Sequence, residues 1–255
     1  MPNYSTKAVV LHSFDYSEQD KIVTFFTRDF GKIKGIAKGA KKSKKRFSPL
    51  EIITLVSLSF FEKETNNLIR INNTLILDPY SGIKENFNKF VYGNYILELI
   101  NEMTGEKEIN PEAFDLLLDF LGIFDKQKTK KYFLRIFEIR LLKYLGYQPH
   151  LSTCLVCQKP LSKREDYFFC FDKGGIVCLH CLRSKEKTVK ISLGTLKTLT
   201  IAQDYTRDKV SRLIFSREAE KESNEILPPF IEYHIGKRMK SLQFMEKVKI
   251  NDNVG

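Results

Sequence analysis

Hydrophobic and polar residues alternate over much of residues 1–80, in short runs separated by Asp, Asn, Gly and Lys. The runs are rich in β-branched and aromatic residues, and alternation of this kind predicts strands with one buried face. We expect five strands, at residues 7–13, 21–28, 32–37, 50–61 and 68–77. Five short strands suit a small closed barrel such as an OB-fold, although an SH3-like barrel or a small sandwich fits the pattern nearly as well.

The hydrophobic period changes after these strands, and from about residue 84 onward apolar residues recur at the spacing of a helix. A second helix is predicted at residues 111–124, because Pro111 after Asn110 is a favourable helix start. A third is predicted at about residues 129–145, and its apolar stripe is most simply a face packed on a core.

A cysteine-rich segment then interrupts the helical pattern, which resumes at Ser192, a residue type that caps helix N-termini. Further helices are predicted over about residues 208–240, and Pro228-Pro229 is expected to break or begin one of them. The whole pattern indicates an α+β fold, with a five-stranded OB-fold-like barrel followed by an all-helical domain. We expect domains at residues 1–80 and 81–255, with a metal-binding insert at about 150–185.

The charge composition narrows the class of partner. Among 255 residues, 42 are Lys or Arg and 31 are Asp or Glu, which gives a formal net charge of +11. Such an excess favours a polyanionic partner, either nucleic acid or an acidic protein surface.

Residues 1–20 lack the pattern of a secretory signal, and the longest mainly apolar run, at 52–61, is too short to span a membrane. We therefore expect a soluble intracellular protein with no membrane partner.

Four of the five cysteines form two spaced pairs. Cys154 and Cys157 are separated by two residues, as are Cys178 and Cys181, and 20 residues lie between the pairs. The two-residue spacing lets a tight turn direct both sulfurs of a pair toward one ion, and two pairs complete a tetrahedron of thiolates. In a reducing compartment this spacing favours metal ligation over disulfides. The sequence therefore predicts one structural zinc ion held by these four cysteines.

A catalytic zinc is disfavoured, because four thiolates close the coordination sphere and leave no position for water or substrate. An aromatic run at residues 167–171 and a turn at 172–175 predict the hairpin of a zinc ribbon between the two pairs. Cys170 lies within that run and is expected to be a packed free thiol. Two alternatives stay open: His180 replaces one of the cysteines as a ligand, or the cysteines are reduced and share no metal.

The segment between Phe30 and Leu50 contains eight basic residues and no acidic ones, and thus carries eight of the eleven net charges. Lys32 and Lys34 alternate with Ile33, which predicts that both lysines lie on one exposed strand face. A basic face on strands 2 and 3 of a small barrel, with an adjoining basic loop, is a typical route for single-stranded nucleic acid. The alternative is a solvated loop that aids solubility. The candidate contacts are Lys32, Lys34, Lys38, Lys41, Lys42, Lys44, Lys45 and Arg46.

Aromatic residues and a second basic patch are further candidates. Phe26, Phe30 and Phe47 offer stacking surfaces for bases, although phenylalanine is more often part of a core. Lys131 and Arg135 are four residues apart and share a helix face. A solvated face is the simpler interpretation of that pair, and docking of an acidic, aromatic-ended peptide is the functional one.

No Walker A loop, HExxH, GxSxG or acidic pair in a nuclease-like context occurs, and the four histidines are scattered along the chain. The sequence assembles no catalytic centre, and no catalytic residue is assigned. It therefore favours a binding protein over an enzyme.

Three further segments are informative: AVVLHSFDYSEQDKIVTFFTRDFGKIKGIAKGAKKSKKRF near the N-terminus, LGYQPHLSTCLVC at the entry to the cysteine segment, and HIGKRMKSLQF at residues 234–244. They resemble segments of the RecO family of bacterial recombination mediators. These segments occur in the family's order over nearly the whole chain. The resemblance implies an N-terminal OB-fold followed by a helical domain with an inserted zinc module.

The resemblance also implies a function. RecO-like proteins bind single- and double-stranded DNA, anneal complementary strands and cooperate with RecR. Together the two help RecA displace single-strand-binding protein, whose acidic C-terminal tail such proteins contact, and they work in the cytoplasm at the nucleoid. On this basis we assign DNA binding to the basic residues of 32–46 and the tail site to Lys131 and Arg135. The alternative functions are an RNA- or ribosome-associated zinc-ribbon protein and a zinc-containing nuclease.

Overall fold

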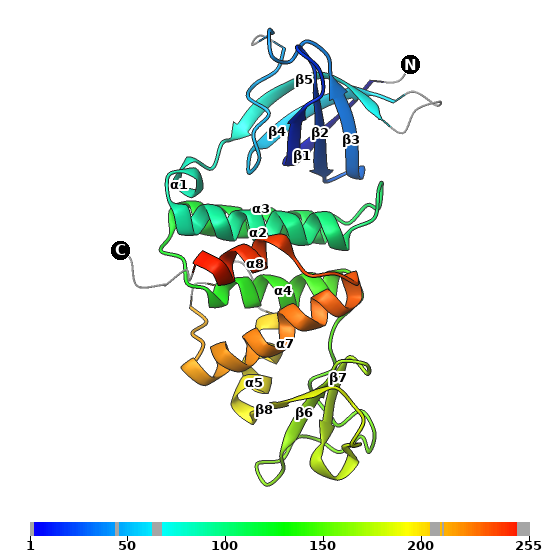
Figure 1. Ribbon diagram of the computed structural model, residues 1–255, viewed down its shortest axis with the longest axis vertical. Helices are drawn as coiled ribbons and strands as arrows, with labels where there is room; N and C mark the ends of the chain where they lie inside the picture. The colour runs from blue at the N-terminus through cyan, green and yellow to red at the C-terminus, as the bar shows by residue number, and fades with distance from the viewer. Residues whose placement is uncertain (1–2, 44–45, 63–67, 205–209, 211, 249–255) are drawn as a thin grey trace. The chain divides into compact units, whose positions relative to one another are not determined.

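The computed structural model describes residues 3–43, 46–62, 68–204, 210 and 212–248, which form two compact units (Figure 1). One unit comprises the described residues up to Lys128 with residues 244–248, and the other those from Thr129 to Gln243. The first unit contains a barrel and three helices, and the second contains further helices and a small cysteine-bearing sheet. This arrangement confirms the predicted α+β class.

Five strands form a closed barrel in the first unit. They are β1 (Asn3–Asp15), β2 (Lys21–Thr27), β3 (Gly31–Ala37), β4 (Leu55–Phe61) and β5 (Ile69–Asp78). Their order is β1-β2-β3-β5-β4, with β4 paired to β1, and only the β3–β5 pair is parallel. A small five-stranded barrel of this kind is an OB-fold, so the predicted barrel is confirmed.

Alternate residues of the strands fill the barrel interior, among them Ala8, Val10, Val23, Phe25, Ile33, Val56, Leu58, Phe60 and Ile71. Gly35 permits closure, because a Cβ at this position would lie 2.6 Å from Cγ1 of Ile69, its partner on β5. The strand predicted at residues 50–61 begins only at Leu55. The preceding residues form a bend, in which Ile53 has a φ of 55° and is 0% exposed. The apolar side chains before Leu55 therefore pack into the core although their backbone is not part of the strand.

An irregularity in β1 decides which of its side chains face outward. Val10 and His12 pair with adjacent residues of β2, so Leu11 is an additional residue, a β-bulge. In a regular strand His12 would share the inward face of Val10. The bulge instead turns His12, and with it Phe14, onto the outer face that carries Thr24 of β2.

Three helices follow the barrel in the first unit: α1 (Ser81–Lys84), α2 (Phe87–Met103) and α3 (Pro111–Lys126). The side chain of Asn86 accepts a hydrogen bond from the backbone N–H of Lys89, and that of Asn110 accepts one from Ala113 at 2.8 Å. Each asparagine therefore caps a helix. Pro111 occupies the first turn of α3, as predicted.

The start of β3 lies against the segment that follows α2. The backbone N–H of Lys107 donates to the carbonyl oxygen of Lys32 at 2.9 Å. Gly31 has a φ of 64°, and a Cβ there would lie 2.2 Å from the carbonyl oxygen of Glu108. The backbone of this segment thus packs directly on β3, and only glycine fits at the contact.

The second unit contains α4 (Tyr132–Tyr144), α5 (Leu193–Asp204) and α7 (Arg217–Ile235), and α8 (Lys240–Val248) is the last described helix. Oγ of Ser192 accepts a hydrogen bond from the N–H of Thr195 at 3.2 Å, which confirms the predicted cap. The cysteine-bearing sheet has the order β7-β6-β8 and is formed by β6 (Tyr167–Cys170), β7 (Gly175–Cys178) and β8 (Thr188–Ile191). The antiparallel β6–β7 pair is the predicted hairpin.

The expectation that Pro228-Pro229 breaks or begins a helix is wrong, because both prolines lie inside α7. Because proline has no backbone N–H, the carbonyls of Asn224 and Glu225, four residues earlier, receive no helical hydrogen bond from Pro228 and Pro229. Neither residue is buried, so water can hydrogen-bond to these carbonyls. Packing holds the helix on both sides of the prolines, through the buried residues Ile226, Leu227, Phe230 and Ile231.

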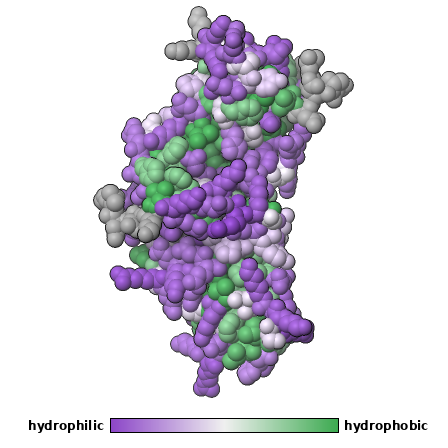
Figure 2. Space-filling view, in the orientation of Figure 1, coloured by the Kyte–Doolittle hydropathy of each residue, from purple (hydrophilic) through white to green (hydrophobic). Residues whose placement is uncertain are grey.

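Hydrophilic residues cover most of the face shown in Figure 2, with hydrophobic patches between them. Within the described part of the chain, no helix has the length and apolar content needed to cross a bilayer. Among the exposed large hydrophobic residues, Phe14 is 47% exposed and lies beside Lys34 on the barrel.

Gly31→Ala should destabilise the first unit more than Gly39→Ala. Both glycines have positive φ values, 64° and 71°, so each substitution costs about 1 kcal/mol of backbone strain. Only at Gly31 does the new Cβ meet backbone, and the displacement should cost about 1–3 kcal/mol more. Thermal unfolding measures the difference, and equal Tm values for the two variants would contradict the packing at Glu108.

Candidate nucleic-acid surface and metal centre

The four predicted cysteine ligands lie together, with their sulfur atoms all within 4.8 Å of one another. Cys154 and Cys157 come from the loop before β6, Cys178 ends β7, and Cys181 ends the short 3-10 helix η1 (Leu179–Cys181). Sγ of Cys157 lies 3.8 Å from Sγ of Cys178. Two ligands of a tetrahedral ion, each at about 2.3 Å, are separated by about that distance. The cluster can therefore hold one metal ion.

Backbone hydrogen bonds form the first of the two cysteine turns. The N–H of Gln158 donates to the carbonyl of Cys154 at 2.9 Å, and the N–H of Cys154 donates to the carbonyl of Lys159 at 3.1 Å. Gln158 adopts a φ of 62°, the left-handed conformation that closes such a turn. The turn brings Cys154 and Cys157 to the same side, as their spacing predicts.

The thiols of the cluster differ in acidity. Burial acts to raise the pKa of Cys154, but hydrogen bonds from the backbone N–H groups of Cys157, Cys178 and Val156 outweigh it and lower this pKa to about 6. Burial raises the pKa of Cys178 to about 12, and the side chain of Cys181 adds to this effect. Burial and the neighbouring sulfur atoms therefore disfavour ionisation of Cys178, and a divalent cation would stabilise its thiolate. The donor set fits a cation that prefers sulfur ligands.

Two other candidates lie outside the cluster. Cys170 is fully buried in β6, as expected of a packed thiol. The side chain of His180 is 83% exposed and lies 3.8 Å from a carboxylate oxygen of Glu165. Among the described residues, the metal-ligand cluster consists of the four cysteines, and His180 replaces none of them.

The basic segment runs along β3 and the loop after it. Five of its predicted contacts are exposed: Lys34, Lys38, Lys41, Lys42 and Arg46. Nζ of Lys34 lies 5.6 Å from the ring centroid of Phe14, and the Arg46 guanidinium lies 5.0 Å from that of Phe47. Lys44 and Lys45 lie outside the described residues. The structure thus brings a row of exposed cations onto one strand and its loop.

Lys32 does not lie on an exposed face as predicted, since it is half-buried. Its Nζ donates to the carbonyl oxygens of Asn101 and Thr104, the latter at 2.6 Å. These carbonyls lie at the C-terminal end of α2, where carbonyls lack helical partners and a cation is favoured. Burial lowers the pKa of Lys32, and nearby glutamates oppose that shift. Lys32 therefore connects the barrel to α2.

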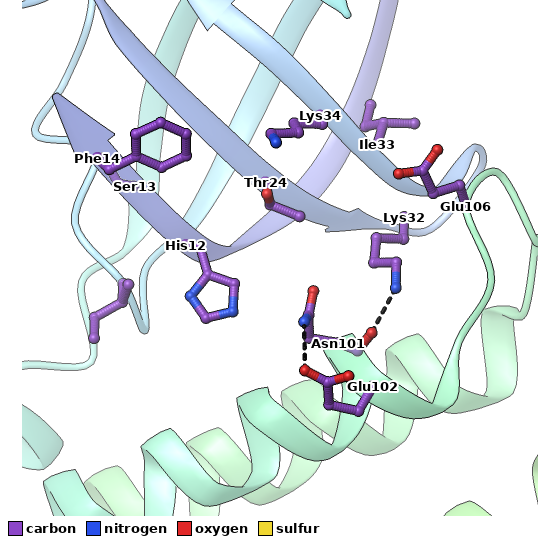
Figure 3. A pocket seen from close by; sticks show the side chains of 11 residues that line it. His12, Ser13, Phe14, Thr24, Lys32, Ile33, Lys34, Asn101, Glu102 and Glu106 are labelled. Carbon is purple, nitrogen blue, oxygen red and sulfur yellow. Dashed lines mark hydrogen bonds between the residues drawn. The ribbon is translucent and has the colours of Figure 1, made fainter. Parts of the chain in front are cut away.

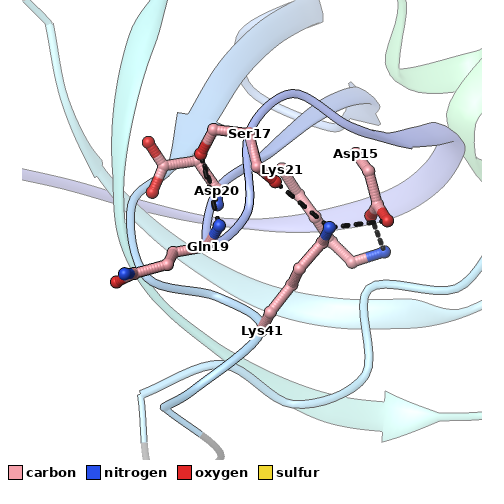
Figure 4. Close-up of polar contacts among 6 residues, drawn as sticks. All are labelled: Asp15, Ser17, Gln19, Asp20, Lys21 and Lys41. Carbon is pink, nitrogen blue, oxygen red and sulfur yellow. Dashed lines mark hydrogen bonds and ion pairs between the residues drawn. The ribbon is translucent and has the colours of Figure 1, made fainter.

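Lys41 is held by an ion pair (Figure 4). Its Nζ lies 2.7 Å from a carboxylate oxygen of Asp15 and donates to the carbonyl of Ser17 at 3.1 Å. Lys21 also pairs with Asp15, at 3.2 Å. Hydrogen bonds from Lys41 and Lys21 lower the pKa of Asp15, so its carboxylate stays charged and competes with any phosphate for Lys41.

The phenylalanines considered as stacking surfaces are largely part of the core. Phe26 is 0% and Phe47 3% exposed, and Phe30 packs edge-on against Tyr4 and Phe60. Sequence reasoning missed Phe14, the exposed aromatic residue on this barrel face. A strict alternation along β1 gives no signal for it, because the bulge at Leu11 lies within the strand.

The predicted solvated face of α4 requires a correction. Arg135 is 1% exposed and pairs with Glu138, which is 0% exposed. An arginine can be buried in this way when a carboxylate one helical turn away compensates its charge. Lys131 is half-buried at the start of the helix. The two residues therefore do not form one solvated basic face.

Together, the barrel with its basic strand and the helical unit with its four-cysteine cluster define a two-part α+β protein in which four clustered cysteines can hold a metal ion. Two family models match the chain: the N-terminal region of recombination protein O over residues 1–80, and its C-terminal region over 84–243. The chain belongs to the recombination protein O (RecO) family.

Full-length relatives agree with this membership. The chain is 34% identical over 249 residues to a protein of Syntrophus aciditrophicus named DNA repair protein RecO, with 96% of each chain covered. It is 32% identical over 254 residues to a protein of the same name from Desulfatibacillum aliphaticivorans, with 98% of each covered. A third such protein, from Anaeromyxobacter dehalogenans, is 28% identical over 249 residues, covering 97% of this chain and 98% of the relative.

Replacing Cys154 and Cys157 together by alanine should abolish stoichiometric metal binding and lower solubility, because two remaining thiolates cannot complete a tetrahedron. Binding of a structural ion contributes on the order of 10 kcal/mol to folding of its own subdomain. Metal content per chain after gel filtration is the measurement. Cys170→Ser is the matched control and should keep its ion. A double variant that still holds one ion per chain would refute the cluster as the site.

Proposed function

We propose that the protein is a DNA-binding recombination mediator that acts in DNA repair without catalysing a reaction. The observation that carries this proposal is the row of exposed cations along β3 and its loop, Lys34, Lys38, Lys42 and Arg46, on a closed five-stranded barrel. In such barrels the face of strands 2 and 3 is a common path for single strands. Membership of the RecO family, whose relatives are named DNA repair proteins, supports the role in repair.

The proposed contacts are mainly electrostatic. Lysine contacts to phosphates give affinity that does not depend on the base sequence. Lys44 and Lys45 stay among the proposed contacts, and Lys41 becomes available when a phosphate replaces Asp15 as its partner. Lys32 serves as a positioning residue, because its ammonium group is bound by α2. With five or six phosphates neutralised, the logarithm of the binding constant falls against log salt with a slope of about −4.

The ion proposed for the four-cysteine cluster is Zn²⁺, one per chain. Four thiolates suit zinc and complete its tetrahedron, so the ion has a structural role. It would join the loop before β6 to the end of β7 and to η1. Zinc would supply folding energy there and no chemistry.

In this proposal the barrel domain, residues 1–80, binds single- and double-stranded DNA. The helical domain, residues 81–255, carries the zinc module and the contacts with protein partners. The protein anneals complementary strands and, with RecR, helps RecA load onto strands coated with single-strand-binding protein, in the cytoplasm at the nucleoid. Because Arg135 is buried against Glu138, the tail of single-strand-binding protein is no longer assigned to it.

Replacing Lys38 and Lys42 together by alanine should weaken binding to single-stranded DNA and slow annealing of strands coated with single-strand-binding protein. Two fewer phosphate contacts should make the log–log salt slope shallower by about 1.4. Fluorescence anisotropy over a salt series gives the slope, and a strand-annealing assay gives the rate.

The matched control is Lys163→Ala with Lys185→Ala, which removes the same charge from exposed positions before β6 and between η1 and β8. It should leave the slope within about 0.3 of the wild type. Equal slopes for both double variants would remove the barrel loop from the DNA surface, and tighter binding of RNA than of DNA would replace the proposed substrate.

Asp15→Asn should strengthen binding to single-stranded DNA about three- to five-fold near 0.1 M salt, because it releases Lys41 for one more phosphate contact. Glu18→Gln removes the same charge from a neighbouring exposed residue that forms no ion pair among the described residues, and should change affinity less. Identical gains in both variants would show that overall charge, and not release of Lys41, sets the affinity.

A further inference from the structure

A cavity of about 570 Å³ opens on the outer face of the barrel, within the first unit (Figure 3). Strands β1, β2 and β3 form one wall, and the C-terminal end of α2 with the following segment forms the other. Its volume lies within the range of about 300–1,000 Å³ that is usual for small-molecule sites. A single nucleotide therefore fits, whereas a duplex does not.

The register of the strands determines which side chains line the wall formed by β1, β2 and β3. His12, Thr24 and Lys34 lie directly opposite one another across β1, β2 and β3. Phe14 lies two residues beyond His12 on the same face, with its ring 47% exposed. The bulge at Leu11 places His12 and Phe14 on this wall. An exposed aromatic ring therefore stands beside a lysine on the strand 2–3 face.

The opposite wall carries negative charge. Glu102 lies in the last turn of α2, and Glu106 follows the helix. The ammonium group of Lys32 is bound to the α2 carbonyls between the walls, which fixes the end of the helix against β3. Figure 3 shows Phe14 at one end of the cavity and Glu106 toward the other. The two carboxylates repel phosphates and attract N–H donors, so the cavity favours a base over a phosphate.

We propose that this cavity is a nucleobase subsite, which takes one unpaired base of single-stranded DNA stacked on Phe14 and prefers bases with an exocyclic amino group. Glu102 and Glu106 accept hydrogen bonds from that amino group, as acidic side chains do from N4 of cytosine. Thymine and uracil present a carbonyl at that position, which a carboxylate repels. Lys34 holds the adjoining phosphate outside the cavity. This inference rests on the proposed binding of single-stranded DNA.

Lys34 already occupies a position over the Phe14 ring, 5.6 Å from its centroid. An exposed cation–π contact is weaker than stacking of a base on an aromatic ring. The entering base therefore displaces the ammonium group, which is then available to a phosphate of the same strand. The base then takes the place of the Lys34 ammonium group on the Phe14 ring, and this exchange requires no movement of the backbone.

The test compares oligodeoxycytidine with oligodeoxyuridine of equal length. Their bases differ in the exocyclic group, an amino group in cytosine and a carbonyl in uracil, and at N3, an acceptor in cytosine and an N–H donor in uracil. The wild type should bind the cytidine strand about three- to ten-fold more tightly in anisotropy titrations at fixed salt. Phe14→Ala should weaken binding of both strands about ten-fold, and Phe14→Tyr should restore it. Thermal unfolding of each variant checks that the barrel stays folded.

The carboxylates are tested through the ratio of the two affinities, which a change in overall charge does not move. Glu102→Gln and Glu106→Gln should each bring the ratio toward one, because an amide can also donate to the uracil carbonyl. Glu18→Gln, outside the cavity, should keep the wild-type ratio. Equal affinity for both strands in the wild type, or no effect of Phe14→Ala, would overturn the subsite and leave DNA binding in place. Absence of binding to either strand would overturn the proposed function with it.

Discussion

Closure of the barrel is the constraint on which the rest of the first unit depends. β3 and β5 pair in parallel at Gly35 and Ile69, where any larger residue than glycine would hold the strands apart. Once the barrel is closed, every second side chain must fill its interior, and recognition is confined to the outer positions. Part of that outer face is covered, since Phe26 packs on Phe114 of α3 and Lys32 is bound by α2. The uncovered part is the candidate DNA surface.

Local regularities made much of the structure predictable. The alternation of apolar residues located the barrel strands, the Asn110-Pro111 pair located the start of α3, and the two-residue cysteine spacing located the metal cluster. Whether a single charged side chain is exposed or paired depends on residues far away in the chain, and a local sequence pattern carries no information about them. The ammonium group of Lys32 donates to a carbonyl 69 residues later in the chain, and Lys41 forms an ion pair with Asp15, from which β2 and β3 separate it. That the exposed cations bind DNA stays a prediction, because position alone does not identify a ligand.

The cysteine-bearing sheet is small, and a metal ion held by the four cysteines would compensate for its size. Each of its strands, β6, β7 and β8, has only four residues, so the sheet has little interior of its own. Phe169 is fully buried and packs edge-on against Phe230 of α7, which anchors one face of the sheet to the helical unit. Backbone hydrogen bonds join the other parts of the module: the N–H of Leu155 donates to the carbonyl of Ile176 at 2.9 Å, and the N–H of Leu179 in η1 donates to the carbonyl of Asp166 at 3.0 Å. Coordination by a shared ion would supply the constraint that a small apolar core cannot.

The bulge at Leu11 has a consequence for how this sequence can change over generations. Removal or addition of one codon in a surface loop usually shortens or lengthens a connection and little else. Within a regular strand such as β2 or β3, the same event would exchange the inner and outer faces of every residue beyond it. At the bulge it would not, because after loss of Leu11 the residue His12 would follow Val10 directly, and His12 and Phe14 would keep their outer face in a regular strand. Selection should therefore tolerate a change of length at Leu11 that it would reject in the middle of β2 or β3.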